Sequence, residues 1–186
     1  FMLVSDVGDA VALIRQCRYA LAAEQQKAGE YEAAAELYES LGVYEEAETR
    51  AKYCRYMAGV YALGAGELEK AADQLKLAGD YEDAADRFGD AALTLGSAAM
   101  EAGDYQTAIH WLEQLPRDAE TAKALDGAIY AYADQLEQEG QRETAATEFY
   151  SLGSYQDAQA RGNALEYALA MEEKAADVES ALDRFE

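Results

Sequence analysis

Few side chains in this sequence are of the types that do acid–base chemistry at neutral pH. His110 is the only histidine. The positions 37 residues before and after it hold Asp73 and Thr147, and such a polar series is typical of a solvent-facing helix surface. A general base also needs a partner group that orients it, and the sequence offers none for His110. We therefore predict that the chain is not an enzyme and has no catalytic residue.

Three aspartates, Asp83, Asp86 and Asp90, fall on one face of a predicted helix, and Asp80 lies just before it. Carboxylate oxygens of this kind bind Ca²⁺, yet the loop spacing of an EF-hand is absent. A charged, solvent-facing surface explains the four aspartates better. We predict no metal site and no other cofactor.

The two cysteines, Cys17 and Cys54, stand 37 residues apart. Equivalent positions in stacked helical units are separated by roughly 8–10 Å, the distance between packed helices. A disulfide needs Cα atoms within about 7 Å, and two cysteines without histidines make a poor zinc site. We predict that both thiols are reduced and buried as small apolar side chains, which is compatible with a cytoplasmic location without establishing one.

The composition excludes several classes of function. The 186 residues hold 15 Lys and Arg against 37 Asp and Glu, a net charge of −22. Phosphate backbones and anionic lipid surfaces repel such a chain, so we expect it to bind neither nucleic acid nor membrane surfaces. No apolar stretch approaches the ~18 residues that would span a bilayer. The sequence starts at Phe1, which we interpret as a fragment of a longer product whose location stays open.

A repeat of 37 residues organises the chain, and a single proline lets helix follow helix with few breaks. Each repeat predicts a long helix, such as residues 45–63, and a shorter antiparallel helix, such as residues 67–77, both ended by glycines. Five series of residues keep the spacing without a slip: Gly29, Gly66, Gly103 and Gly140; Gly42, Gly79, Pro116 and Gly153; Ala34, Ala71, Ala108 and Ala145; Tyr38, Leu75, Leu112 and Phe149; Leu41, Ala78, Leu115 and Leu152.

The pattern Gly-x-Tyr-x-x-Ala-x-x-x-Tyr at Gly29, Tyr31, Ala34 and Tyr38 resembles the tetratricopeptide repeat, and the resemblance covers essentially the whole chain. Gly59 matches the small residue that this family places seven positions before the turn glycine. The chain departs from the family in its period of 37 rather than 34 residues, and in lacking the proline that ends each unit. The resemblance implies a right-handed superhelix of stacked helix pairs.

We predict one all-α repeat domain over residues 1–186, a solenoid of five antiparallel helix pairs. The pairs are expected at approximately residues 7–41, 45–78, 82–115, 119–152 and 156–186. In this register residues 1–4 form the tail of a preceding short helix. Val178, Ala181 and Phe185 fit the short-helix positions of the fifth pair if one residue is deleted, which predicts a degenerate closing pair.

One position of the long helices carries an aromatic ladder. Its members are Tyr19, Tyr56, Leu93, Tyr130 and Tyr167. In proteins that resemble tetratricopeptide repeats, this face lines a concave groove that holds a partner peptide. The implied partner-binding residues are Tyr19, Tyr56, Val60, Leu63, Met100, Tyr130, Asp134, Glu137 and Tyr167. The acidic end of this groove suits a protein or peptide with apolar anchors and some Lys or Arg. Alternatively, the tyrosines pack between adjacent long helices.

Together, the repeat, the aromatic ladder and the lack of candidate catalytic residues in the sequence predict a non-catalytic protein-interaction scaffold. Two alternatives stay open. The chain could be an architectural spacer, in which the stacking of helices is itself the function, or a regulatory or docking arm of an enzyme whose catalytic domain lies outside this sequence. Exposure of the tyrosine ladder distinguishes the scaffold from the spacer.

Overall fold

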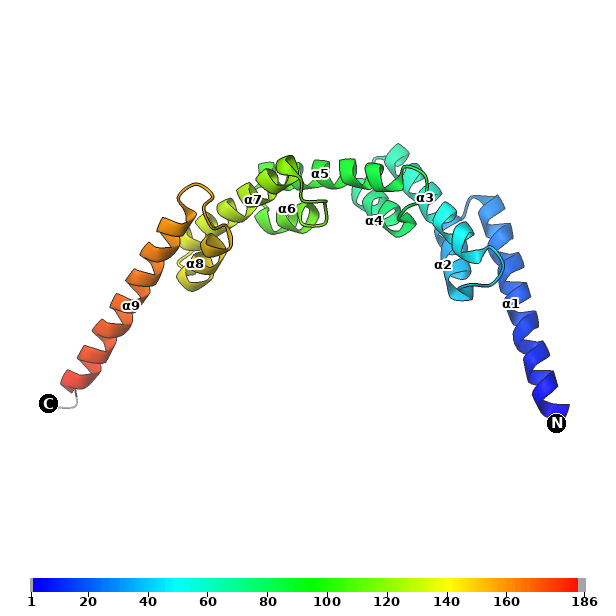
Figure 1. Ribbon diagram of the computed structural model, residues 1–186, viewed down its shortest axis with the longest axis horizontal. Coiled ribbons are helices and arrows are strands. Elements are labelled where there is room, and N and C mark those ends of the chain that lie inside the picture. The colour runs from blue at the N-terminus through cyan, green and yellow to red at the C-terminus, as the bar shows by residue number, and fades with distance from the viewer. Residues whose placement is uncertain (1, 184–186) are drawn as a thin grey trace. The chain divides into compact units, whose positions relative to one another are not determined.

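A computed structural model describes residues 2–183, together with the side chains of residues 8–175 and 177. Over residues 2–183 the chain forms nine helices and no strand, which confirms the all-α prediction (Figure 1). The helices are α1 Met2–Ala28, α2 Tyr31–Leu41, α3 Ala47–Ala65, α4 Leu68–Ala78, α5 Ala84–Ala102, α6 Tyr105–Leu112, α7 Ala119–Gln138, α8 Arg142–Ser151 and α9 Ala158–Asp183.

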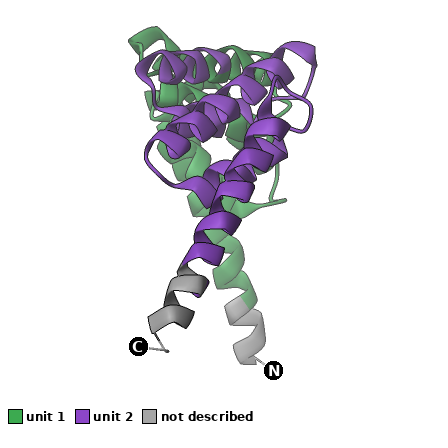
Figure 2. Cartoon of the chain, turned by 90° about the vertical axis from the view of Figure 1, so that its left-hand side faces the viewer, with its two compact units in different colours: residues 1–92 green, residues 93–186 purple. Residues whose placement is uncertain are grey.

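The helices group into two compact units, residues 1–92 and residues 93–186, and the boundary falls inside α5 (Figure 2). In unit 1, α1 packs on α2, α2 on α3 and α3 on α4. In unit 2, α6 packs on α7, α7 on α8 and α8 on α9. Within each unit, helices that follow one another in sequence are therefore neighbours, as short connections favour. The right-handed solenoid remains a prediction.

The core of unit 1 centres on the short helix α2. Tyr38 and Ala34 of α2 are fully buried, in one cluster with Ala47 and Cys54 of α3. The Tyr38 hydroxyl reaches the end of α1, where it donates to Gln26 Oε1 at 3.1 Å. A buried aromatic side chain of this size contributes about 2 kcal/mol through the hydrophobic effect. Tyr38 of α2 thus contacts both neighbouring long helices, α1 and α3.

Glycines on two long helices make room for a leucine of the short helix that follows. A Cβ built on Gly59 would come 2.6 Å from Leu75 Cγ and 3.3 Å from the Ala71 carbonyl oxygen. In unit 2, a Cβ built on Gly96 would come 2.8 Å from Leu112 Cγ. Both distances to Cγ are below van der Waals contact, so a larger residue would force the leucine side chain, or the helix that carries it, to shift.

The other two helix pairs use alanine at this glycine position and an aromatic residue in place of the leucine. Ala22 stands with Tyr38 in the core of unit 1, and Ala133 stands with Phe149 in the core of unit 2. The residue types of the two positions therefore vary together.

Left-handed backbone at one residue ends each of the first four long helices. At Gly66, φ is +78° and the backbone N–H donates to the Leu63 carbonyl oxygen at 3.1 Å. Gly29, Gly103 and Gly140 repeat this conformation, with φ of 81°, 76° and 81°. An L-residue with a Cβ costs about 1–2 kcal/mol in this region, so glycine is favoured at the end of each of these four long helices.

The next member of this glycine series is Asp177, and there the helix does not turn. Helix α9 is continuous over Ala158–Asp183, so the prediction of a fifth helix pair is wrong. An aspartate favours left-handed backbone far less than glycine does, and the helix continues instead. The side chains of Val178 and Ala181, and the whole of Phe185, lie outside the described part of the chain.

The first helix also differs from the prediction, at its N-terminal end. Ser5 stands where the glycines Gly42, Gly79 and Gly153 begin the connections to the following pair. Helix α1 is continuous from Met2 to Ala28, so residues 2–4 do not belong to a separate short helix. Ser5 provides neither the left-handed backbone of the glycines at this position nor the helix-breaking ring of Pro116, which takes it in the connection between α6 and α7.

The connection between α6 and α7 starts α7 with a different device. The Asp118 carboxylate accepts hydrogen bonds from the backbone N–H groups of Glu120 and Thr121, both at 2.9 Å, and the Thr121 hydroxyl accepts from the Asp118 N–H at 3.0 Å. The bonds from Thr121, followed by that from Glu120, lower the pKa of Asp118. This capping box satisfies the first N–H groups of α7. The other three connections carry a tyrosine at this position: Tyr44, Tyr81 and Tyr155.

Candidate functional site

Tyr130 shows how the aromatic ladder is held in unit 2. Its ring lies edge-on to Phe149, with centroids 5.4 Å apart, and 6.0 Å from Tyr155. Its hydroxyl donates to Asp157 Oδ1 at 2.5 Å, and the Arg161 guanidinium lies 5.5 Å from the ring centroid. Tyr155, Asp157 and Arg161, which follow α8 in sequence, therefore all contact Tyr130 of α7.

Tyr56 repeats this arrangement in unit 1. Its hydroxyl donates to Asp83 Oδ1 at 2.7 Å, its ring centroid lies 5.6 Å from that of Tyr81, and Arg87 lies 5.9 Å from the ring. The hydrogen bond to Asp83 raises the pKa of Tyr56. The hydrogen bonds from Arg87 and then Tyr56 lower the pKa of Asp83. The tyrosine thus stays protonated and the acid stays charged over the neutral pH range.

The arginine varies together with the tyrosine of the ladder. Tyr19 has the corresponding neighbours, Tyr44 with centroids 5.8 Å apart and Arg50 at 5.7 Å. In unit 2, Leu93 takes the ladder position and Ala124 takes the arginine position. A guanidinium over an aromatic face gains about 0.5–1 kcal/mol at an exposed site, and a leucine offers no such face. An arginine therefore occurs at this position in the three repeats whose ladder residue is a tyrosine that it contacts, and not in the repeat whose ladder residue is Leu93.

Tyr19, Tyr56 and Tyr130 are half-buried by these contacts. All three take part in the packing of consecutive helix pairs, in line with the alternative in which the ladder packs between helices. Their role in binding a partner stays a prediction.

Tyr167 differs from the other three tyrosines. It lies on α9 at the same repeat position, and 69% of its surface is exposed. Met171, one helical turn further along α9, is also exposed. The arginine and acid that cover the other tyrosines come from a following helix pair, and no such pair follows α9 within the described residues. Tyr167 therefore presents a largely uncovered ring.

The two predicted acids of the groove, Asp134 and Glu137, share one cation. Arg161 Nη2 donates to Asp134 Oδ1 at 2.7 Å and also to the Glu137 carboxylate. The same guanidinium lies 4.4 Å from the ring centroid of Phe149. Burial disfavours its charge, but its hydrogen bonds to Tyr130, Asp134 and Glu137 outweigh this and raise the pKa of Arg161. The acids are thus partly neutralised inside unit 2.

The apolar members of the predicted set are only partly available. Val60, Leu63 and Met100 are half-buried. Leu63 packs against the cluster of Leu75 and its buried neighbours, so its main contacts are internal. The structure brings Val60 and Leu63 onto one helix, α3, and places Met100 on α5.

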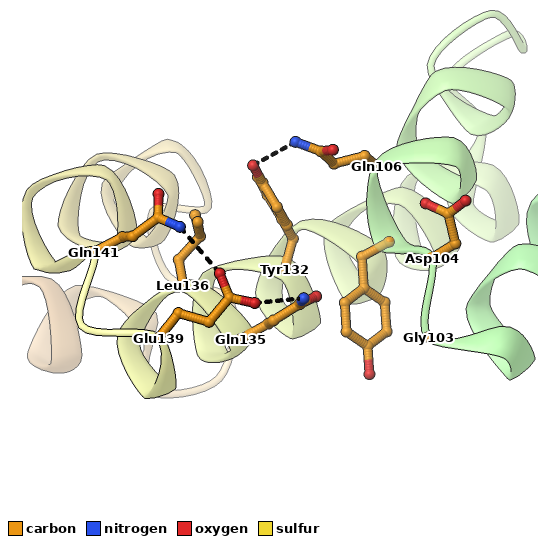
Figure 3. Close-up of a pocket in the computed structure, with 9 residues that line it drawn as sticks. Gly103, Asp104, Gln106, Tyr132, Gln135, Leu136, Glu139 and Gln141 are labelled. Carbon is orange, nitrogen blue, oxygen red and sulfur yellow. Dashed lines mark hydrogen bonds between the residues drawn. The ribbon is translucent and has the colours of Figure 1, made fainter.

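A crevice recurs where the turn after a long helix meets the C-terminal half of the next long helix. In unit 2, about 310 Å³ lie between the turn at Gly103 and Asp104 and the end of α7 (Figure 3). Gln106 donates to the Tyr132 hydroxyl at 2.6 Å on one side, and Glu139 accepts from the Gln135 amide at 2.8 Å on the other. In unit 1 the same positions form a crevice of about 330 Å³ beside Tyr31.

Sequence reasoning missed this crevice and the arginine series Arg50, Arg87 and Arg161. The arginines keep the 37-residue spacing and could have been found in the same way as the glycines. The crevice could not, because several of its lining positions change between the units: Tyr61, Ala65 and Glu67 in unit 1 correspond to Gln135, Glu139 and Gln141 in unit 2.

The residues first considered for chemistry lie apart from one another. His110 is exposed and lies edge-on to Trp111, with ring centroids 5.3 Å apart. Asp83 bonds to Arg87 and Asp80 to Lys52, each at 2.8 Å, so both acids take part in ion pairs. Among the described residues, no group of three His, Cys, Asp or Glu side chains is placed to hold a metal ion.

Both cysteines are free thiols, but only Cys54 is buried. The prediction that Cys17 is a core residue is wrong: its side chain is exposed, and residues 2–4 are part of α1 rather than of a separate short helix that could cover it. Burial raises the pKa of the Cys54 thiol to about 11. In the part of the chain that the structure describes, every helix is too short or too polar to cross a bilayer.

Comparison with known proteins identifies no family. No protein-family model matches the chain, and no curated protein matches it significantly.

Proposed function

We propose that this chain is a non-catalytic protein-interaction scaffold that resembles the tetratricopeptide repeat, with its helix pairs stacked as a right-handed solenoid. The long helices present a face to a segment of a partner protein. The packing of sequence-adjacent helices in each unit supports a repeat of this kind, and so does the recurrence of the same tyrosine–arginine contact.

The exposed ring of Tyr167 carries this proposal. Its counterparts Tyr19, Tyr56 and Tyr130 each receive an arginine, and Tyr56 and Tyr130 also donate to an aspartate. Tyr167 occupies the same repeat position on α9, and among the described residues its ring is 69% exposed and therefore accessible. Exposed aromatic side chains of this kind are characteristic anchors of protein interfaces.

The chemistry of the partner follows from the same comparison. A segment that places Lys or Arg over the Tyr167 ring would gain the contact seen at the other tyrosines. An apolar residue beside the cation would cover Met171, which is exposed. The net charge of −22 favours the approach of a basic segment.

Selection from a random peptide-display library tests the proposal. We expect enriched peptides to combine Lys or Arg with an apolar or aromatic residue, and to lose binding to a Tyr167→Ala variant, because this substitution removes the ring without adding charge. Tyr61→Ala is the matched control, since Tyr61 is 62% exposed in unit 1. Circular dichroism checks that both variants keep their helices. The proposal fails if no peptide is enriched, or if both variants bind equally well.

The architectural spacer is a second candidate function. It is favoured by the observation that Tyr19, Tyr56 and Tyr130 are engaged in contacts between consecutive helix pairs. A spacer predicts that Tyr167 also serves stacking, with a further helix pair as its partner rather than a separate protein. The peptide selection distinguishes the two functions, since a spacer enriches no basic peptide.

A further inference from the structure

A hollow in unit 1 has an apolar rim that the repeat does not require. It holds about 310 Å³ between α2, the connection to α3, and the end of α4. Two side chains at its edge are strongly exposed, Val43 at 94% and Leu77 at 56%. The floor is formed by buried residues of the core, Tyr38 and Ala51. An apolar ligand group placed here would remove these side chains from water.

Comparison among the repeats shows that both rim residues are exceptions. The positions equivalent to Val43 hold Asp80, Arg117 and Ser154, and those equivalent to Leu77 hold Ser40, Gln114 and Ser151. All six are polar, so the fold does not need an apolar residue at either place. Two apolar exceptions at the edge of one hollow, both exposed to water, indicate an interaction surface.

The equivalent hollow in unit 2 is lined differently. It holds about 270 Å³ above Leu112 and Leu125, and Arg117 stands where unit 1 has Val43. The Arg117 guanidinium is paired with Asp126 at 2.7 Å. An apolar ligand bound at this rim would displace water from the charged side chains of Arg117 and Asp126, and this desolvation disfavours its binding. At the position of Val43, the rim of the unit 1 hollow is therefore apolar, whereas the rim of the unit 2 hollow carries an ion pair.

The charged residues around the hollow indicate which charge the ligand carries beside its apolar group. Glu39 and Glu48 line the hollow, and Glu45 and Glu46 lie in the connection beside it. Glu39 is paired with Arg55 at 2.7 Å and Glu46 with Arg50 at 3.3 Å, so basic residues of a ligand would meet chiefly Glu45 and Glu48. The one cation that lines it, Lys52, is paired with Asp80 at 2.8 Å. The surroundings of the apolar rim are therefore acidic, and basic residues on either side of an apolar ligand group would be attracted.

We propose that this hollow, defined by Val43, Leu77, Tyr38 and Ala51, binds a segment of a partner protein through one aliphatic side chain flanked by Lys or Arg. The proposal rests on the proposed scaffold function and names a second surface for it, separate from Tyr167. The aliphatic side chain, of the size of Leu, Ile or Met, lies between Val43 and Leu77. The basic residues beside it face the acids of the connection.

Methyl NMR with defined peptides tests this proposal. The probe is a 12-residue peptide with one central Leu among Lys and Ser, compared with a Lys/Ser peptide without Leu and a Glu/Ser peptide with Leu. We expect the methyl resonances of Val43 and Leu77 to shift with the first peptide alone. A Val43→Ser/Leu77→Gln variant, which takes residues from equivalent repeat positions, should bind that peptide at least tenfold more weakly. Val11→Ser/Leu13→Gln is the matched control on α1, where both side chains are exposed.

The outcomes separate this surface from the scaffold function. Shifts at Val43 and Leu77 together with a selective loss in the first double variant support the hollow. If the peptide binds and shifts other methyl groups, or binds the first double variant as well as the wild type, the hollow is wrong and the scaffold function stands. If neither these peptides nor the display library yields a binder, both proposals are overturned. Binding lost equally in both double variants also overturns the hollow.

Discussion

Helices α1 and α3 carry the same repeat positions in different surroundings. In α3, Ala47, Ala51 and Cys54 are buried beneath the short helix α2. In α1, the equivalent residues Ala10, Ile14 and Cys17 are exposed, since residues 2–28 form one continuous helix and provide no short helix over this face. A residue's place in the repeat determines the face on which it lies, and its neighbour along the chain determines whether that face is buried.

The largest expected effect comes from filling the space beside a covered helix. Gly59→Leu places a side chain where even a Cβ would lie 2.6 Å from Leu75 Cγ, so we expect a loss of at least about 3 kcal/mol in the free energy of unfolding. Ala170→Leu makes a similar change at the equivalent position of α9, which is exposed, and should change stability by less than about 0.5 kcal/mol. Urea unfolding followed by circular dichroism measures both.

A double variant checks the reason for the effect at Gly59. Gly59→Ala/Leu75→Phe recreates the alanine–aromatic pair of Ala133 and Phe149 and should be more stable than Gly59→Ala alone. If Gly59→Leu and Ala170→Leu lowered the free energy of unfolding by the same amount, this would contradict the distinction between covered and uncovered helices.

The tyrosine ladder provides a second, smaller test within unit 2. Tyr130→Ala removes the ring that Arg161 and Phe149 contact, and we expect a loss of about 2 kcal/mol in the free energy of unfolding. Tyr167→Ala removes the same side chain where it is mostly exposed, and the loss should stay below about 0.5 kcal/mol. The measurement is the midpoint of urea unfolding. A loss at Tyr167 as large as that at Tyr130 would show that its ring is covered in solution.

The smallest perturbation uses the two native cysteines. Burial and a pKa of about 11 keep Cys54 as an inaccessible thiol at pH 8, whereas Cys17 is exposed. We expect iodoacetamide at pH 8 to alkylate Cys17 at least tenfold faster than Cys54, because the thiolate is the reacting form. Mass spectrometry of the digested protein gives both rates. Once urea has unfolded the chain, the two rates should converge, and similar rates in the folded protein would contradict the packing of α2 on α3.

The sequence predicted the features that repeat and failed where a feature depends on a missing neighbour. The helices, their turns and the small residue at Gly59 were predictable, since each leaves a regular 37-residue signal. The burial of Cys17 and the fifth helix pair were predicted wrongly, because the pattern alone does not show that Ser5 and Asp177 fail to turn the chain. Pairing of Asp134 with Arg161 was also missed, since it joins side chains of different repeats.

The packing of sequence-adjacent helices has a consequence for the speed of folding. In each unit, the helices that pack extensively are consecutive in sequence. Closing such short loops loses little chain entropy, and domains rich in local contacts fold within microseconds to milliseconds. Folding can therefore begin at any helix pair and spread to its neighbours, as in other repeat arrays. Among the described helices, α1 packs extensively on α2 alone and α9 on α8 alone, so we expect these two helices to exchange their amide hydrogens first.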